Sequence, residues 1–118
     1  MRRKPGTLLP LEVSILEAAL LLRAAGAAEF HGYLIAGKVK ERAETKSLTA
    51  HGTLYKALDR MQTAGLIASR WEDPQVAADE ERPRRRFYHV TASGEGALVD
   101  AQERAAIAKL ASQQAVPA

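Results

Sequence analysis

The sequence predicts a mainly α-helical fold with a small two-stranded antiparallel hairpin and a long C-terminal helix. Apolar residues recur at helical spacing in three segments before Gly65. Two short segments, 66–72 and 86–91, then alternate between apolar and polar residues, which is typical of strands. An alanine- and glutamate-rich segment, 92–113, returns to helical character. This order of three helices, strand, charged loop, strand and helix is that of a winged helix-turn-helix.

Composition limits the classes of protein to consider. With 118 residues the chain has the length of one domain. It contains no cysteine, which excludes disulfides and thiolate metal sites and favours a reducing, cytoplasmic location. The longest apolar stretch, Ala18–Leu22, is far shorter than the roughly 20 residues of a membrane span, so no membrane association is expected. A formal net charge of +3 is compatible with a polyanionic partner.

The first helix is expected over 8–25, after a flexible basic arm at 1–7. Its apolar residues lie on almost every face, so it must be buried on more than one side. Contact with a second subunit would achieve this burial, and so would a central position in its own core. Gly26 ends the helix, because glycine readily adopts the left-handed conformation found at helix C-termini.

The second and third helices form a consecutive pair. The second is expected over 30–43, and Ser47 or Thr49 is a candidate N-cap for the third. The third helix runs to about Ala64 and ends at Gly65. It carries one apolar stripe at the i, i+4, i+7 spacing, made of Leu54, Leu58 and Met61.

The two alternating segments predict a hairpin, with 73–85 between them. That connection holds two prolines and many charges, so an irregular loop is expected. Trp71, on the first strand, is interpreted as a packing residue rather than a platform for a ligand. Thr91 is a candidate N-cap for the terminal helix.

The third helix has the composition of a DNA-reading helix. In a helix-turn-helix, the second helix of the pair enters the major groove with its N-terminal residues toward the bases. The small, polar or cationic candidates here are Thr49, His51, Gly52, Thr53, Tyr55, Lys56 and Arg60. An ordinary amphipathic surface helix would also carry charges opposite its apolar stripe, and that alternative stays open.

A basic cluster precedes the second strand. The run 82–86 contains four arginines in five positions. On a hairpin beside a DNA-reading helix, such a cluster suits phosphate contacts or a narrow minor groove. The alternative is a solvated charge run offset by the preceding acidic residues, Asp79, Glu80 and Glu81. Because these residues would repel DNA, we expect them at the outer tip or turned aside.

Several motifs in this order resemble those of PadR-type regulators, over roughly Leu8 to Leu110. The matching segments are His31-Gly32-Tyr33-Leu34-Ile35, Gly52-Thr53-Leu54-Tyr55-Lys56-Ala57-Leu58, Gly65-Leu66-Ile67, Trp71-Glu72, Arg82-Pro83-Arg84-Arg85-Arg86-Phe87-Tyr88 and Thr91-Ala92-Ser93-Gly94. The resemblance implies a winged helix-turn-helix homodimer that represses from a pseudo-palindromic operator in double-stranded DNA. It also implies that repression is often relieved by a small aromatic or hydrophobic effector.

The resemblance also implies which residues face DNA. On the third helix these are Thr49, Gly52, Thr53, Tyr55 and Lys56. The hairpin contributes Arg82, Arg84 and Arg85, and the turn around His31 and Tyr33 is expected to approach the DNA backbone. Glu81 stands where the family commonly has glycine, and Lys56 where it commonly has proline. The terminal helix, which pairs with the first helix in family dimers, contains no aromatic residue.

Other classes of function receive little support. Ser47, His51 and Asp59 lack the glycine-flanked nucleophile context of a hydrolase, so no enzyme is expected. The three histidines show no metal-ligand spacing, and neither a metal nor a cofactor is expected. A winged helix that binds an acidic protein partner stays as the alternative. The expected division is a basic arm at 1–7, a DNA-binding domain at 8–91 and a dimerisation helix with a frayed tail at 92–118.

Overall fold

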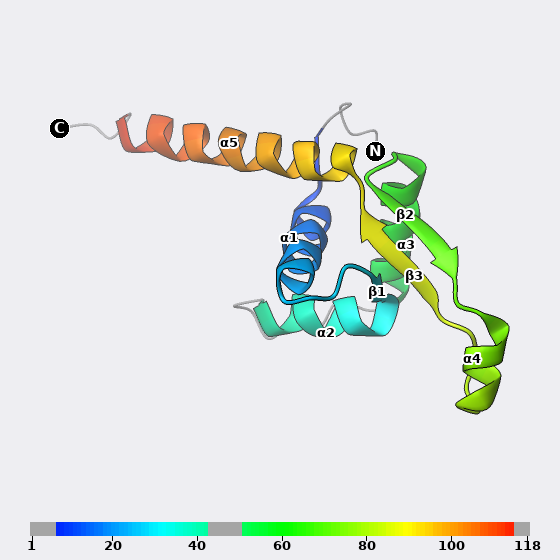
Figure 1. Cartoon of the computed structure of the whole chain (residues 1–118). Helices are drawn as coiled ribbons and strands as arrows, with labels where there is room; N and C mark the ends of the chain where they lie inside the picture. The colour runs from blue at the N-terminus through cyan, green and yellow to red at the C-terminus, as the bar shows by residue number, and fades with distance from the viewer. Residues whose placement is uncertain (1–6, 43–50, 115–118) are drawn as a thin grey trace.

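A computed structural model of the chain describes residues 7–42 and 51–114. Its elements are α1 (Pro10–Ala24), β1 (Phe30–His31), α2 (Gly32–Arg42), α3 (His51–Thr63), β2 (Ile67–Trp71), α4 (Pro74–Asp79), β3 (Arg86–Val90) and α5 (Ala92–Gln114) (Figure 1). The mainly helical fold with a hairpin and a long C-terminal helix is confirmed. The predicted N-caps Ser47 and Thr49, and most of the N-terminal arm, lie outside the described residues.

The sheet has three strands where the sequence predicted two. Its order is β1-β3-β2, and both pairings are antiparallel. The prediction of a helix from residue 30 was wrong for its first two residues, because Phe30 pairs with Tyr88 and His31 with Phe87. The rings of Phe30 and Tyr88 stack with centroids 5.7 Å apart, which holds this short strand against the hairpin.

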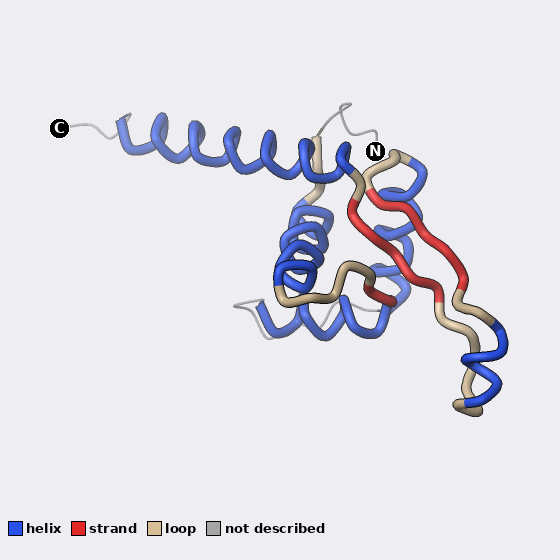
Figure 2. Tube along the Cα trace, viewed as in Figure 1, coloured by secondary structure: helices blue, strands red, loops and turns tan. Residues whose placement is uncertain are grey.

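The hairpin connection contains a short helix, α4, and the prediction of an irregular loop was wrong there. Asp73 caps α4, since its carboxylate accepts a hydrogen bond from the backbone N–H of Gln75 at 2.8 Å. Pro74 occupies the first helical position, where the missing N–H costs nothing. Figures 1 and 2 show α4 at the far tip of the hairpin, away from α1 and α5.

Three predicted helix boundaries are confirmed, at Gly26, Gly65 and Thr91. Gly26 and Gly65 have φ values of 105° and 78°, and end α1 and α3. The residue after each glycine donates its backbone N–H to a carbonyl oxygen of the preceding helix. The N···O distance is 2.8 Å for Ala27 and 2.9 Å for Leu66. Thr91 caps α5, because its hydroxyl accepts from the backbone N–H of Gly94 at 3.1 Å.

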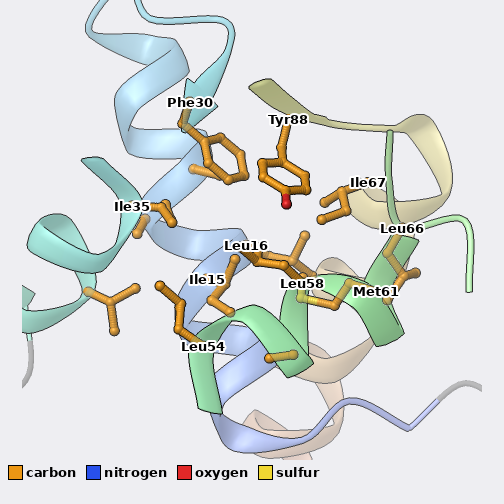
Figure 3. Packing of buried hydrophobic residues seen from close by; sticks show 14 of the residues in the cluster. Ile15, Leu16, Phe30, Ile35, Leu54, Leu58, Met61, Leu66, Ile67 and Tyr88 are labelled. Carbon is orange, nitrogen blue, oxygen red and sulfur yellow. The ribbon is translucent and has the colours of Figure 1, made fainter. Parts of the chain in front are cut away.

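The core forms where α1, α2, α3 and the sheet meet (Figure 3). The predicted stripe of α3 is buried, and it packs with Ile15 and Leu16 of α1. Because α1 contacts α2, α3, β3 and α5, it is the central helix of its own core. It still leaves Leu21 largely exposed, so part of its apolar surface is available to a partner.

The long helix α5 joins the core only through its first turns (Figure 1). A Cβ at Gly94 would overlap the carbonyl oxygen of Leu66, so this glycine permits the close approach. Leu98 is buried, whereas the large apolar residues farther along are exposed, namely Val99, Ile107 and Leu110. Among the described helices, none combines the length and hydropathy needed to cross a membrane.

Candidate nucleic-acid interface

An open groove of about 650 Å³ separates the start of α2 and the outer face of α3 from the hairpin. Aromatic rings line it from four elements, namely Tyr33 of α2, Tyr55 of α3, Trp71 of β2 and Tyr88 of β3. The arginine run 82–86 lines the hairpin side. Of the described α3 residues that the sequence assigned to DNA contact, the groove includes Tyr55, which lines it beside the acidic Asp59. The groove therefore brings Tyr33 and Tyr55 together with the arginine run, while the other candidates on α3 lie outside it.

The outer face of α3 presents most of the predicted residues to solvent. Gly52, Thr53, Tyr55 and Lys56 are exposed, while the apolar stripe faces inward. His51 begins α3, and its side chain lies outside the described part, as does Thr49.

Tyr55 also joins the two helices of the helix-turn-helix. A Cβ at Gly32 would overlap the Tyr55 ring and hydroxyl, so the ring lies directly against the start of α2. Because glycine lacks a Cβ, Gly32 permits this contact. Tyr55 thus reaches the groove from a position fixed by both helices.

The base of the hairpin tip is organised around Glu72. This carboxylate accepts two hydrogen bonds from Arg82, at 2.7 and 2.8 Å, and one from the backbone N–H of Arg85, at 3.2 Å. Arg82, assisted by Arg85, lowers the pKa of Glu72 to about 2. We call the contacts among Glu72, Arg82 and Arg85 the hairpin clasp.

The four arginines of the run divide into two kinds. Arg82 is held by the clasp and also pairs with Glu80. Arg86 is half-buried and donates to Ser69 of β2 at 3.0 Å and to Gln62 of α3 at 3.1 Å. Arg84 and Arg85 are exposed. The Nε of Arg84 nevertheless donates to the backbone carbonyl of Glu72 at 3.0 Å. Three of the four arginine side chains therefore hold the hairpin in shape.

Trp71 is not the packing residue that the sequence suggested. Its side chain is 55% exposed and lies on the groove. The guanidinium groups of Arg84 and Arg86 each lie 5.6 Å from its ring centroid. The register of β2 explains the error, because Trp71 pairs with Arg86 at the end of the strand, beyond the reach of the core.

His31 caps α2 at the floor of the groove. Its Nδ1 accepts a hydrogen bond from the backbone N–H of Leu34 at 3.3 Å. Burial lowers the pKa of His31, and the nearby charges of Arg85 and Arg82 lower it further. The neutral ring is therefore the form that suits this site. Tyr33, two residues on, is exposed.

A family model described as the transcriptional regulator PadR-like family matches residues 21–100. The chain belongs to this family. The resemblance noted in the sequence is thereby confirmed, and membership in a family of transcriptional regulators agrees with the expectation of a protein that is not an enzyme.

Solved structures of PadR-like proteins are similar to this chain. A PadR family regulator from Clostridium difficile is 32% identical with a TM-score of 0.61, and the match covers 86% of this chain and 95% of that one. A transcriptional regulator from Clostridium thermocellum has a TM-score of 0.67 at 21% identity, over 91% and 93%. Bacillus subtilis PadR, solved in complex with operator DNA, has a TM-score of 0.59 at 26% identity, over 80% of this chain and 47% of that one. No curated protein matches significantly.

In this PadR-like chain the acidic residues before the arginine run lie at the outer tip, as expected. Asp79 ends α4, and Glu80 is paired with Arg82. Glu81 has a φ of 55°, in the left-handed region that favours glycine. The chain thus keeps the turn that a glycine would make at this position.

Three residues that position the interface were missed in the sequence. Glu72, Gln62 and Ser69 act through contacts with the arginines of the hairpin, across separations of 10 to 24 residues. An acid preceding a basic run was the one available signal, for Glu72. Within the described ranges no group of histidine, aspartate or glutamate is suited to hold a metal.

Proposed function

We propose that this PadR-like chain is a homodimeric repressor that binds a pseudo-palindromic operator. In this proposal α3 enters the major groove, and the hairpin contacts the adjacent phosphate backbone. The observation that carries the proposal is the shared groove, which is lined by α3 on one side and by the arginine run on the other.

The proposed contacts divide by chemistry. The residues near base edges would be those at the start of α3, namely Gly52, Thr53 and Tyr55, together with the predicted Thr49 and His51. Lys56, Arg84 and Arg85 are exposed cations that suit phosphate oxygens. The exposed hydroxyl side chain of Tyr33 would contact the backbone. Arg82 supports this surface through the clasp.

The proposed dimer uses α1 and α5. The exposed apolar residues Leu21, Ile107 and Leu110 support a second copy as the partner of these helices. A two-fold dimer would set two α3 helices about 34 Å apart, one turn of DNA. Residues 8–91 would then form the DNA-binding domain, and 92–118 the dimerisation element.

Operator binding can be tested by fluorescence anisotropy with the duplex upstream of the chain's own coding region, and a scrambled duplex as control. We expect preference for the native duplex and a steep loss of affinity as the salt concentration rises. The slope of log K against log salt concentration, called the salt slope below, should be about −0.9 per phosphate contact. The double variant Tyr55→Ala, Lys56→Ala should abolish the preference. Lys40→Ala is the matched control, because it removes an equal charge from an exposed position in the last turn of α2, outside the groove.

Each other outcome has a definite meaning. Equal, weak binding to both duplexes would contradict the proposal and favour an acidic protein partner for the arginines. A monomer in sedimentation at micromolar concentration would contradict the dimer. The family resemblance also implies a small aromatic or hydrophobic effector, for which the test is loss of the operator preference on addition of such a compound.

A further inference from the structure

Glu12 is a fully buried carboxylate at the start of α1, with 0% of its side chain exposed. One oxygen accepts a hydrogen bond from the backbone N–H of Leu9 at 3.0 Å, which closes the first turn of the helix. The other accepts from Nε of Arg60 at 3.3 Å. Arg60 belongs to α3, so one acidic side chain joins the N-terminus of the central helix to the proposed recognition helix.

A buried carboxylate restrains the cation beside it. Removal of the cation from such a pair takes away part of the charge compensation of the buried carboxylate, which is unfavourable. The Arg60 side chain is therefore drawn toward α1 by its Nε. It is 44% exposed and, like Thr53 and Lys56, lies outside the groove, so its pairing with Glu12 is what distinguishes it from those residues.

A second polar contact holds α3 on its other flank. Gln62 accepts from Ser69 at 3.0 Å and from Arg86 at 3.1 Å, both on the sheet. Positions 60 and 62 lie about 200° apart around a helix axis. Apolar packing of the stripe is non-directional and leaves some freedom to rotate. Polar contacts on two opposite flanks remove that freedom.

We infer that Arg60 and Glu12 form a positioning pair that fixes the rotation of α3 about its own axis, and that Arg60 does not contact a phosphate. The pair acts on the choice of operator, because a rotated α3 would aim Thr53 and Lys56 at different atoms of the major groove. This inference rests on the proposed function. It assigns Arg60 a role different from the direct DNA contact that the sequence predicted.

Simple electrostatics predicts stronger binding to operator and scrambled duplex alike, with the ratio of the two affinities unchanged. The substitution Glu12→Gln raises the formal net charge of +3 by one unit, which by itself should strengthen DNA binding. If the pair positions α3, Glu12→Gln should instead reduce discrimination between operator and scrambled duplex. A fully buried side chain cannot act by touching DNA, so this loss would have to pass through α3.

The experiment measures the affinities of Glu12→Gln, Arg60→Gln and the double variant for both duplexes across a salt series. We expect each single variant to lower the ratio of operator to scrambled affinity by about tenfold, and the double variant to be no worse than either. The salt slope should stay that of the wild type in all three. Circular dichroism fixes a temperature at which every variant is folded.

A charge-matched variant and a phosphate-contact variant serve as controls. Arg60→Lys keeps the charge but lacks Nε, and should behave as Arg60→Gln does. Arg85→Gln should reduce the salt slope by about one unit and leave the operator preference largely intact. If Glu12→Gln is too unstable to fold, the two Arg60 variants carry the test alone.

Three results would overturn the inference. The first is a salt slope reduced by about one unit in Arg60→Gln, since that identifies a phosphate contact. The second is additive losses in the double variant, and the third is unchanged discrimination in every variant beside a specific wild type. A wild-type protein without operator preference would instead overturn the proposed function, and this inference with it.

Discussion

The core around α1 and α3 and the hairpin from Glu72 to Arg85 differ in what holds them together. In the core, Ile15, Leu58 and Met61 are completely buried among apolar neighbours. In the hairpin, the described ion pairs are that of Arg82 with Glu72 in the clasp and that of Arg82 with Glu80. Apolar burial depends little on pH or salt, whereas ion pairs depend on both. The hairpin can therefore change with conditions that leave the core intact.

The largest expected effect comes from the core. Leu58→Ala should lower the free energy of unfolding by about 3 kcal/mol, because it opens a cavity in a fully buried site. Urea unfolding followed by circular dichroism measures this loss. Leu110→Ala, at a position 57% exposed, should change stability by less than about 0.5 kcal/mol at protein concentrations that keep the chain monomeric. Equal losses would break the comparison.

Glu72→Gln tests the hairpin. The folded state lowers the pKa of Glu72 to about 2 from its ordinary 4.5. Its stabilising contribution is therefore complete above pH 4.5 and is lost as pH falls toward 2. The free energy of unfolding, measured from pH 5 to pH 2, should fall less steeply in the variant than in the wild type. At neutral pH the variant should bind operator DNA more weakly but keep the packed core. An identical acid profile would exclude the clasp as its cause.

The sequence predicted the parts of the fold that depend on local chemistry. Gly26, Gly65 and Thr91 mark helix boundaries through their own backbone or side-chain preferences, and these were identified correctly. Residues 30–31 were assigned to the wrong element, because a strand this short exists only through its pairing with β3. The cap formed by Asp73 and Pro74 is a local signal for α4 that the charged composition of the loop obscured.

The candidate site was harder to predict than the fold. The sequence identified the arginine run as a unit but could not divide it, because the partners of Arg82 and Arg86 lie on other elements. The burial of Glu12 was equally inaccessible, since Arg60 lies 48 residues farther along the chain. The exposure of a residue could be predicted where local composition decides it. The role of a residue could not be predicted where a contact with a residue distant in sequence decides it.

Glu81→Gly sharpens the comparison on the side of the backbone. A non-glycine residue at a φ of 55° is strained by about 1 kcal/mol. Removal of this strain should raise the free energy of unfolding by up to that amount, less the extra flexibility of glycine in the unfolded chain. Thermal unfolding measures the change, with Glu81→Ala as a control that removes the same side chain but keeps a Cβ at this φ. A lower melting temperature for Glu81→Gly would contradict the proposed strain.

The smallest expected effect is at His31, where the two regions meet. The folded state lowers the pKa of His31, so the unfolded chain binds the proton more readily. Stability should therefore fall as pH drops below about 6.5, and be complete above it. His31→Asn keeps an acceptor for the N–H of Leu34 but does not titrate, so this dependence should vanish. A dependence of unchanged size in the variant would assign the titration to another group.

The position of Trp71 gives the hairpin its own optical signal. It is the one tryptophan of the sequence, and it lies on the groove beside two guanidinium groups rather than in the core. Its emission should therefore respond to opening of the clasp, or to arrival of a nucleic acid, while the ellipticity of the helices stays constant. If the hairpin unfolds before the core, the melting curve recorded by Trp71 emission should lie at lower temperature than the curve recorded by helix ellipticity.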